Sequence, residues 1–174
     1  IVVVDPHRAG HELLYHPGEA NFRMADAIVV NKIDTAKKED INVVLKNIKE
    51  VNPKAKVIMA ESKIIVNSPN LIKNKKVLVV EDGPTLTHGG MTYGAGMVAA
   101  KKLKAKSIVD AEKYAGRSIK DVYKKYSHLK KILPAMGYGK KQVESLKRTI
   151  NNAKCDIVID GSPFNLEKLM KLNK

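Results

Sequence analysis

Residues 27–51 read AIVVNKIDTAKKEDINVVLKNIKEV, and this stretch decides the fold class. The run 27–30 is short, apolar and β-branched, which favours a buried strand. A polar turn follows at 31–35, and the residues after it carry a different periodicity. Apolar side chains recur there at Ile41, Val44, Leu45 and Ile48. The i, i+3, i+4, i+7 spacing predicts one face of a helix over 38–51.

The same alternation of strand, turn and helix extends outward in both directions. Near-continuous apolar strands separated by helices predict an α/β class, with a three-layer α/β/α architecture and a mostly parallel sheet covered on both faces. We expect long loops at 5–21 and 81–96. Ligands of such sheets bind outside the carboxyl ends of the strands. The further strands are predicted at 1–4, 57–59, 77–80, 107–109, 132–133 and 156–160.

Composition narrows the class of protein. The net charge is +14, and lysine supplies 28 of the 32 basic residues. Arginine and aromatic side chains are scarce, so the composition does not favour a protein that reads nucleic acid. Lysine-rich surfaces also occur in hyperthermophile proteins. Apolar runs are too short to span a membrane, so no membrane partner is expected. The single Cys155 fits a reducing, cytoplasmic setting.

Asn31, Lys32 and Asp34 form an Asn-Lys-x-Asp tetrad directly after the strand 27–30. In GTPases this tetrad is the loop that reads guanine. A carboxylate at Asp34 can accept from guanine N1–H and the N2 amine, whereas adenine presents an acceptor at N1. Asn31 can meet the N7/O6 edge, and the Lys32 stem can lie along the base. The alternative is a turn that caps the next helix.

A second base contact is expected after the strand 57–59, where backbone N–H groups of Ala60 and Glu61 can approach the base. No G-x-x-x-x-G-K-[ST] phosphate loop occurs in the sequence. Because the chain also opens inside a strand on Ile1, we expect the carboxyl-terminal portion of a longer protein.

Asp5 and Arg8 close the first strand. Asp5 is a candidate magnesium ligand, and Arg8 a candidate phosphate contact. A strand-end turn before Pro6 explains the same residues equally well.

The segment 81–96 is rich in glycine and leads into a helix, so its backbone N–H groups can form an anion cradle. Beside it, Asp82 and His88 are candidate catalytic acid–base residues. A glycine-rich loop without a ligand is the alternative. The candidate phosphate-binding residues are Thr85, Thr87, Gly89, Gly90, Gly94 and Gly96.

A family resemblance runs through nearly the whole chain, in the segments 3–12, 17–21, 24–26, 30–34, 80–91, 94–96 and 133–139. In these segments the sequence resembles the archaeal cyclic 2,3-diphosphoglycerate synthetase family and its GTPase-like relatives. More distantly, the loop leading into 24–26 and the tetrad are similar to the nickel-insertion GTPases of hydrogenase and urease maturation. Full-length relatives carry a phosphate loop, so the resemblance implies the carboxyl-terminal half of a P-loop NTPase-like fold.

The resemblance implies a purine-nucleotide-dependent enzyme. It is either GTPase-like or an ATP-dependent ligase that closes the phosphoanhydride of cyclic 2,3-diphosphoglycerate, with Mg²⁺ and GTP or ATP as cofactors. The implied partners are a purine nucleotide and a phosphorylated acidic small molecule, and assembly of identical copies is left open. We expect a base-binding half at 1–66, a connector at 67–76 and an α/β subdomain with the anion loop at 77–174. The first alternative is a GTP-sensing module without chemistry of its own, and the second is a nucleic-acid-binding domain driven by charge.

Overall fold

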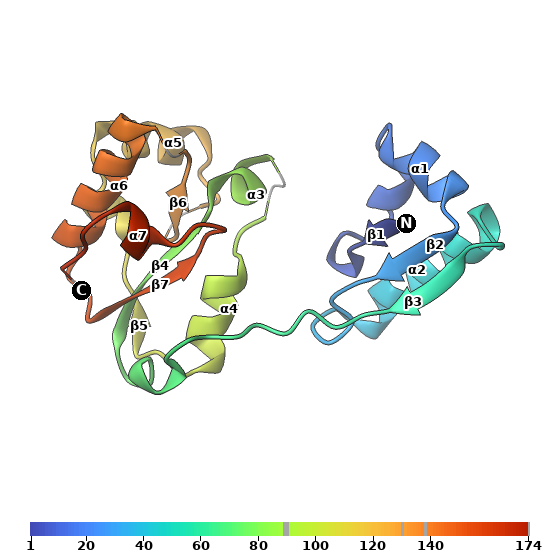
Figure 1. Ribbon diagram of the computed structural model, residues 1–174, viewed down its shortest axis with the longest axis horizontal. Helices are drawn as coiled ribbons and strands as arrows, with labels where there is room; N and C mark the ends of the chain where they lie inside the picture. The colour runs from blue at the N-terminus through green and yellow to red at the C-terminus, as the bar shows by residue number, and fades with distance from the viewer. Residues whose placement is uncertain (89–90, 130, 138, 174) are drawn as a thin grey trace. The chain divides into compact units, whose positions relative to one another are not determined.

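The computed structural model of the chain has two compact units, Ile1–Ile65 and Val66–Lys174 (Figure 1). It describes residues 1–88, 91–129, 131–137 and 139–173. Each unit contains its own parallel sheet. The predicted parallel α/β class is therefore confirmed. No helix in these described ranges is long and apolar enough to cross a bilayer.

Unit 1 is built on three parallel strands in the order β1-β2-β3. Helices α1 and α2 pack on the face that carries Val4, Ile28 and Val30. On the opposite face, Val3 is 62% exposed and Ile58 is 40% exposed, so the described helices of this unit cover one side of the sheet. The elements are β1 (Val2–Val4), α1 (Gly18–Met24), β2 (Ala27–Val30), α2 (Lys38–Val51) and β3 (Lys56–Met59).

The prediction of a loop over 5–21 is wrong. Helix α1 begins at Gly18, and two short 3-10 turns, η1 (Pro6–Arg8) and η2 (His11–Leu13), precede it. Helix α1 buries Phe22 completely. Its end is held by the side chain of Asn52, whose Nδ2 donates to the carbonyl oxygens of Phe22 and Ala25, each at 2.9 Å. Tertiary contacts therefore stabilise a helix in a segment whose proline and glycine suggested a turn.

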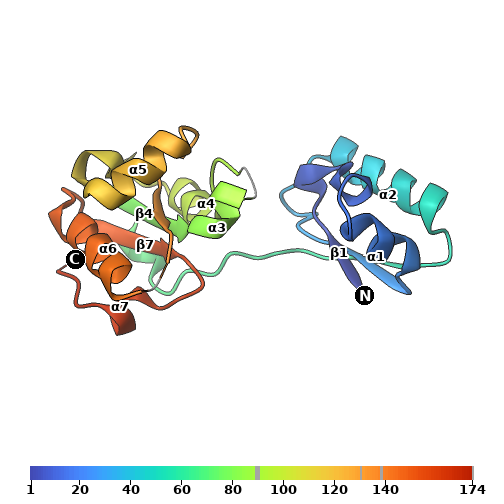
Figure 2. The same cartoon turned by 90° about the horizontal axis from the view of Figure 1, so that it is seen from above.

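Unit 2 is organised around β4 (Lys76–Asp82), which pairs in parallel with three other strands. Its residues 77–80 have no exposed surface. The continuous apolar run is explained by cover on both faces: α4 lies on one side of β4 and β7, and α5 and α6 lie on the other (Figures 1 and 2). The remaining strands and longer helices are α4 (Ala95–Lys102), β5 (Ser107–Ile108), α5 (Arg117–Lys125), β6 (Leu133–Ala135), α6 (Lys140–Asn152) and β7 (Ile157–Gly161).

Two segments of unit 2 differ from simple loops. The stretch expected as a connector contains η3 (Pro69–Leu71), and Ile72 lies in the core of unit 2 with 1% exposure. The stretch 81–96, expected as one long loop, contains α3 (Gly83–His88). Two further short elements follow later in the chain, η4 (Ala111–Tyr114) and α7 (Leu166–Leu169).

Replacing Asn52 with alanine leaves two carbonyl groups at the end of α1 without their donor. We expect the free energy of unfolding to fall by about 1–3 kcal/mol, the cost of stranding buried polar groups. Chemical denaturation followed by circular dichroism measures it. Asn42→Ala, at an exposed position of helix α2, which ends directly before Asn52, is the matched control. Equal effects of the two variants would contradict this assignment.

Candidate functional site

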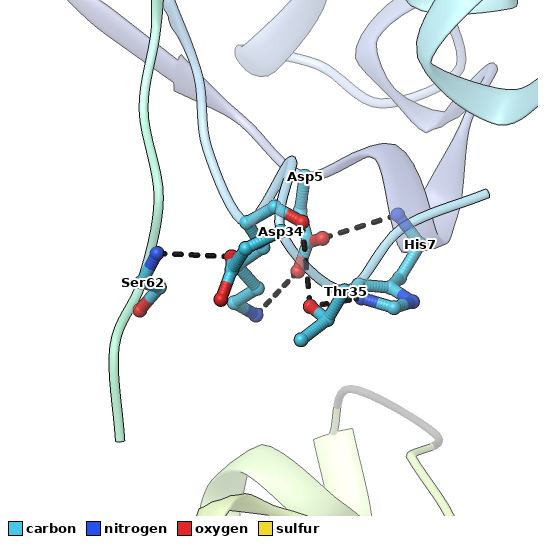
Figure 3. Close-up of polar contacts among 6 residues, drawn as sticks. Asp5, His7, Asp34, Thr35 and Ser62 are labelled. Atoms are coloured by element: carbon cyan, nitrogen blue, oxygen red, sulfur yellow. Dashed lines mark hydrogen bonds and ion pairs between the residues drawn. The ribbon is translucent and has the colours of Figure 1, made fainter. Parts of the chain in front are cut away.

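The carboxyl ends of β1, β2 and β3 bring three separate parts of the sequence together in unit 1 (Figure 3). Asp5 follows β1, the tetrad 31–34 follows β2, and residues 60–62 follow β3. Parallel strands end at the same edge of a sheet, so the predicted tetrad and the predicted second base loop lie side by side.

Backbone hydrogen bonds fasten the tetrad to both neighbouring strands. The N–H of Asn31 donates to the carbonyl of Val4 at 3.0 Å, and that of Ile33 donates to the carbonyl of Ala60 at 3.2 Å. Lys32 lies between them at φ 59°, in the left-handed region that non-glycine residues seldom occupy. The loop therefore has a specific conformation that its neighbours impose.

Asp34 is exposed at the end of this loop. Its Oδ1 accepts a hydrogen bond of 3.1 Å from the backbone N–H of Ser62 (Figure 3). This contact orients the carboxylate and ties the tetrad to the loop after β3. A fixed, solvent-accessible carboxylate of this kind can accept from paired N–H donors of a ligand.

The Asp5 carboxylate forms an ion pair with Lys32. Its Oδ2 lies 2.6 Å from Lys32 Nζ, and its Oδ1 accepts from the backbone N–H of His7 at 3.1 Å. The described residues hold no group of three or more His, Cys, Asp or Glu side chains arranged for a metal ion. If Mg²⁺ binds near Asp5, it must share the carboxylate with a lysine ammonium group.

The other base-site and phosphate candidates of unit 1 lie around this cluster. Ala60 is half-buried, and its N–H donates to the carbonyl of Val30 at 2.9 Å. The Glu61 side chain forms an exposed ion pair with Lys63 at 3.5 Å. Arg8 ends η1 and is half-buried. Arg8 therefore lies in the same short segment after β1 as Asp5. The Glu61 side chain is paired with a lysine of its own loop.

In unit 2, the feature that organises the carboxyl end of β4 is Glu81, which is only 2% exposed. Its Oε1 accepts from the backbone N–H of Met97 at 2.8 Å and of Gly94 at 3.1 Å, at the beginning of α4. A Cβ on Gly161 would lie 2.5 Å from Glu81 Oε2, and one on Gly94 would also collide with that carboxylate. The N–H groups expected to cradle a phosphate thus surround the protein's own carboxylate, and Gly96 lies beside it as well.

Burial raises the pKa of the Glu81 carboxyl above its ordinary value. The backbone N–H groups of Met97, Gly96 and Gly94 act in the opposite direction, and the nearby charge of Asp160 adds to the rise. Asp160 itself accepts from Ser162 Oγ at 2.7 Å, in the turn after β7. Two acidic side chains therefore lie near each other where β4 and β7 end.

The candidate residues Asp82, Thr85 and Thr87 make their hydrogen bonds within the segment 82–87. Asp82 Oδ2 accepts from both the N–H and the hydroxyl of Thr85, at 3.2 and 2.5 Å. The Thr87 hydroxyl donates to the carbonyl of Gly83 at 3.0 Å, and Thr87 is buried. Asp82 thus serves as the cap of this short helix. The side chain of His88 and the whole of Gly89 and Gly90 lie outside the described residues.

The contacts that several residues of these clusters make were not predicted from the sequence. Ser62 is bonded to Asp34 and His7 to Thr35 across the strand ends. These contacts depend on strand register, which is not visible in a single sequence. Glu81 had a usable signal: an acidic residue at the end of an apolar strand, followed by glycines before a helix. A buried carboxylate and a bound anion compete for the same N–H groups.

Comparison with known proteins agrees with the geometry of unit 1. Residues 1–59 match the family model described as CobW/HypB/UreG, nucleotide-binding domain. Unit 1 is similar to a nucleotide-binding domain. This match supports the predicted likeness to GTPase-like proteins, and domains of this type bind a nucleotide and typically Mg²⁺.

A curated protein of Thermococcus kodakarensis, named arginine synthetase ArcE, is 63% identical over 174 residues. The match covers the whole of this chain and 39% of that protein. The chain therefore spans about two-fifths of the relative's length. The expected membership of the cyclic 2,3-diphosphoglycerate synthetase family is not confirmed by either match. The search of solved structures gave no significant match.

The raised pKa of Glu81 predicts a pH-dependent stability. Below the ordinary glutamate pKa both folded and unfolded chains are protonated, and folding buries no charge at Glu81. As the pH rises toward the raised pKa, the unfolded chain loses its proton first, so stability is lost across this window. Glu81→Gln keeps an acceptor but cannot ionise.

We therefore expect the free energy of unfolding of Glu81→Gln, relative to the parent, to increase as the pH rises above the ordinary glutamate pKa. Urea denaturation at each pH measures it. Glu144→Gln, an exposed side chain of α6 paired with Arg148, is the control and should show no such trend. A difference that stays constant with pH for Glu81→Gln would contradict the assignment.

Proposed function

We propose that this chain supplies the guanine-binding loop of a nucleotide-dependent synthetase. The observation that carries the proposal is the exposed Asp34 carboxylate, oriented by Ser62 N–H at the shared edge of three parallel strands. The family match of residues 1–59 supports a nucleotide as the ligand.

The proposed contacts follow from the chemistry of the purine ring. Asp34 accepts from guanine N1–H and the N2 amine, and Asn31 meets the N7/O6 edge. The stem of Lys32 lies along the face of the base. The backbone N–H of Glu61 approaches O6, since that of Ala60 already donates to the carbonyl of Val30. Adenine would place its N1 lone pair against the Asp34 carboxylate, so the proposed preference is for GTP over ATP.

We propose that the reaction of the full-length protein forms arginine, the product given in the relative's name. Identity of 63% over the whole chain supports a common role for this portion of the two proteins. A synthetase couples nucleotide cleavage to bond formation, and Mg²⁺ beside the phosphates would neutralise the charge that develops there. In unit 2, Asp82 and the residues 88–90 remain proposed contacts of the second substrate or the phosphates.

Closure of the phosphoanhydride of cyclic 2,3-diphosphoglycerate is the second proposal for this reaction. It rests on the glycine-rich segment before α4, which could hold a phosphorylated acid. Because Gly94 N–H and Met97 N–H already bind Glu81, this segment offers less room for a phosphate than its sequence suggests.

We expect the full-length protein to form arginine when a nucleotide is present and not when it is omitted, and mass spectrometry measures the product. Formation of the cyclic phosphate instead would favour the second proposal, and binding without turnover would favour a GTP-sensing module.

The base assignment is tested by Asp34→Asn in the full-length protein with Mg²⁺ present. Xanthine carries a carbonyl at C2 where guanine carries its amine, and an asparagine amide can donate to that carbonyl. We expect GTP affinity to fall roughly 10- to 100-fold, because hydrogen bonds to a charged acceptor are lost. Affinity for xanthosine triphosphate should rise over the same range, and calorimetric titration measures both.

Asp26→Asn is the matched control, since Asp26 is an exposed carboxylate that precedes β2 and lies at the opposite end of that strand. It should leave both affinities unchanged. The proposal is overturned if ATP binds the parent protein more tightly than GTP, or if Asp34→Asn binds GTP as the parent does.

A further inference from the structure

The segment that follows β1 holds the tetrad from the side opposite the Ser62 contact. Asp5 accepts from His7 N–H through Oδ1 and from Lys32 Nζ through Oδ2. The first bond caps η1 and fixes the orientation of the carboxylate. The second, at 2.6 Å between side chains that are 24% and 34% exposed, fixes the end of the lysine. Both oxygens of Asp5 are thus engaged.

Lys32 is the residue of the tetrad that most needs such support. Its backbone lies in the left-handed region, at φ 59°, and its side chain has four rotatable bonds. A lysine that is free in solution must lose this rotamer freedom when its stem packs against a ligand. An ion pair already present before binding removes part of that cost.

His7 provides a second attachment. Its Nε2 is hydrogen-bonded to Thr35 Oγ1 at 3.0 Å (Figure 3). The Thr35 hydroxyl also donates to the carbonyl of Lys32 at 3.3 Å. The segment 5–7 therefore contacts the side chain of Lys32 and the residue that follows the tetrad.

We propose that Asp5 is a positioning residue, which acts through Lys32 to hold the base-binding loop in its ligand-ready conformation. The inference deepens the proposed function and rests on it, because the ligand is the purine base of the proposed nucleotide. It assigns Asp5 a role different from magnesium coordination. A magnesium ligand would act on the phosphates, whereas a residue that positions Lys32 acts on the base alone.

The test uses Asp5→Asn in the full-length protein and three ligands: guanosine, GDP and GTP with Mg²⁺. Asparagine keeps an acceptor for His7 N–H but loses the charge that holds Lys32. We expect all three affinities to fall by the same factor, about 2- to 5-fold, the scale of a partly exposed ion pair. Calorimetric titration measures the affinities, and Asp26→Asn again serves as the control.

A double-mutant cycle shows whether Asp5 acts through Lys32. Lys32→Met keeps the apolar stem and removes the ammonium group. In that background Asp5→Asn should change guanosine affinity by less than in the parent, so that the two effects are not additive. Asp5→Glu, which retains the charge, should recover part of the loss. Thermal unfolding of each variant shows that the comparison is made on folded protein.

The outcomes separate this inference from the proposed function. A loss confined to GTP with Mg²⁺, persisting in the Lys32→Met background, would overturn the positioning role and favour magnesium coordination. Guanosine binding that depends on Asp34 but ignores Asp5 would overturn this inference and leave the proposed function standing. Absence of guanosine, GDP and GTP binding by the parent protein would overturn both.

Discussion

Parallel pairing of β2 between β1 and β3 is the constraint on which the candidate site depends. The register places Val4 beside Val30 and Val30 beside Met59, so the three strands end together. Residues that are far apart in the sequence therefore lie side by side at this edge of the sheet. The tetrad after β2 is tied to β1 through the Asp5 carboxylate and to the loop after β3 through Asp34. A one-residue slip of either neighbour would separate these partners.

A different constraint governs unit 2, where a carboxylate is buried at the end of the central strand. Glu81 is stabilised by N–H groups at the beginning of α4, and glycines at 94 and 161 leave the space that it fills. This arrangement joins β4, β7 and α4 through one side chain. It also explains Gly94 before α4 and Gly161 at the end of β7, since a larger residue at either position would collide with the carboxylate.

Features with a strong local signal could be predicted from the sequence. The strand 27–30 follows from its apolar, β-branched residues and the helix 38–51 from its periodicity. The structure contains both with these bounds. The helices Gly18–Met24 and Gly83–His88 could not be predicted in this way. Each begins beside Pro and Gly residues that suggest a turn. Each also depends on distant contacts: α1 on Phe22 in the core and on Asn52 at its end, and the second helix on Leu86 in the core of unit 2. The tetrad was visible in the sequence, whereas its attachment to Ser62 and His7 depends on register.

The central claim concerns where the purine base binds. A crystal structure of the full-length protein with GDP would test it most directly. The account predicts the guanine ring beside the Lys32 stem, with N1 and the N2 amine within hydrogen-bond distance of the Asp34 carboxylate. A guanine ring bound elsewhere, with Asp34 facing solvent, would contradict it.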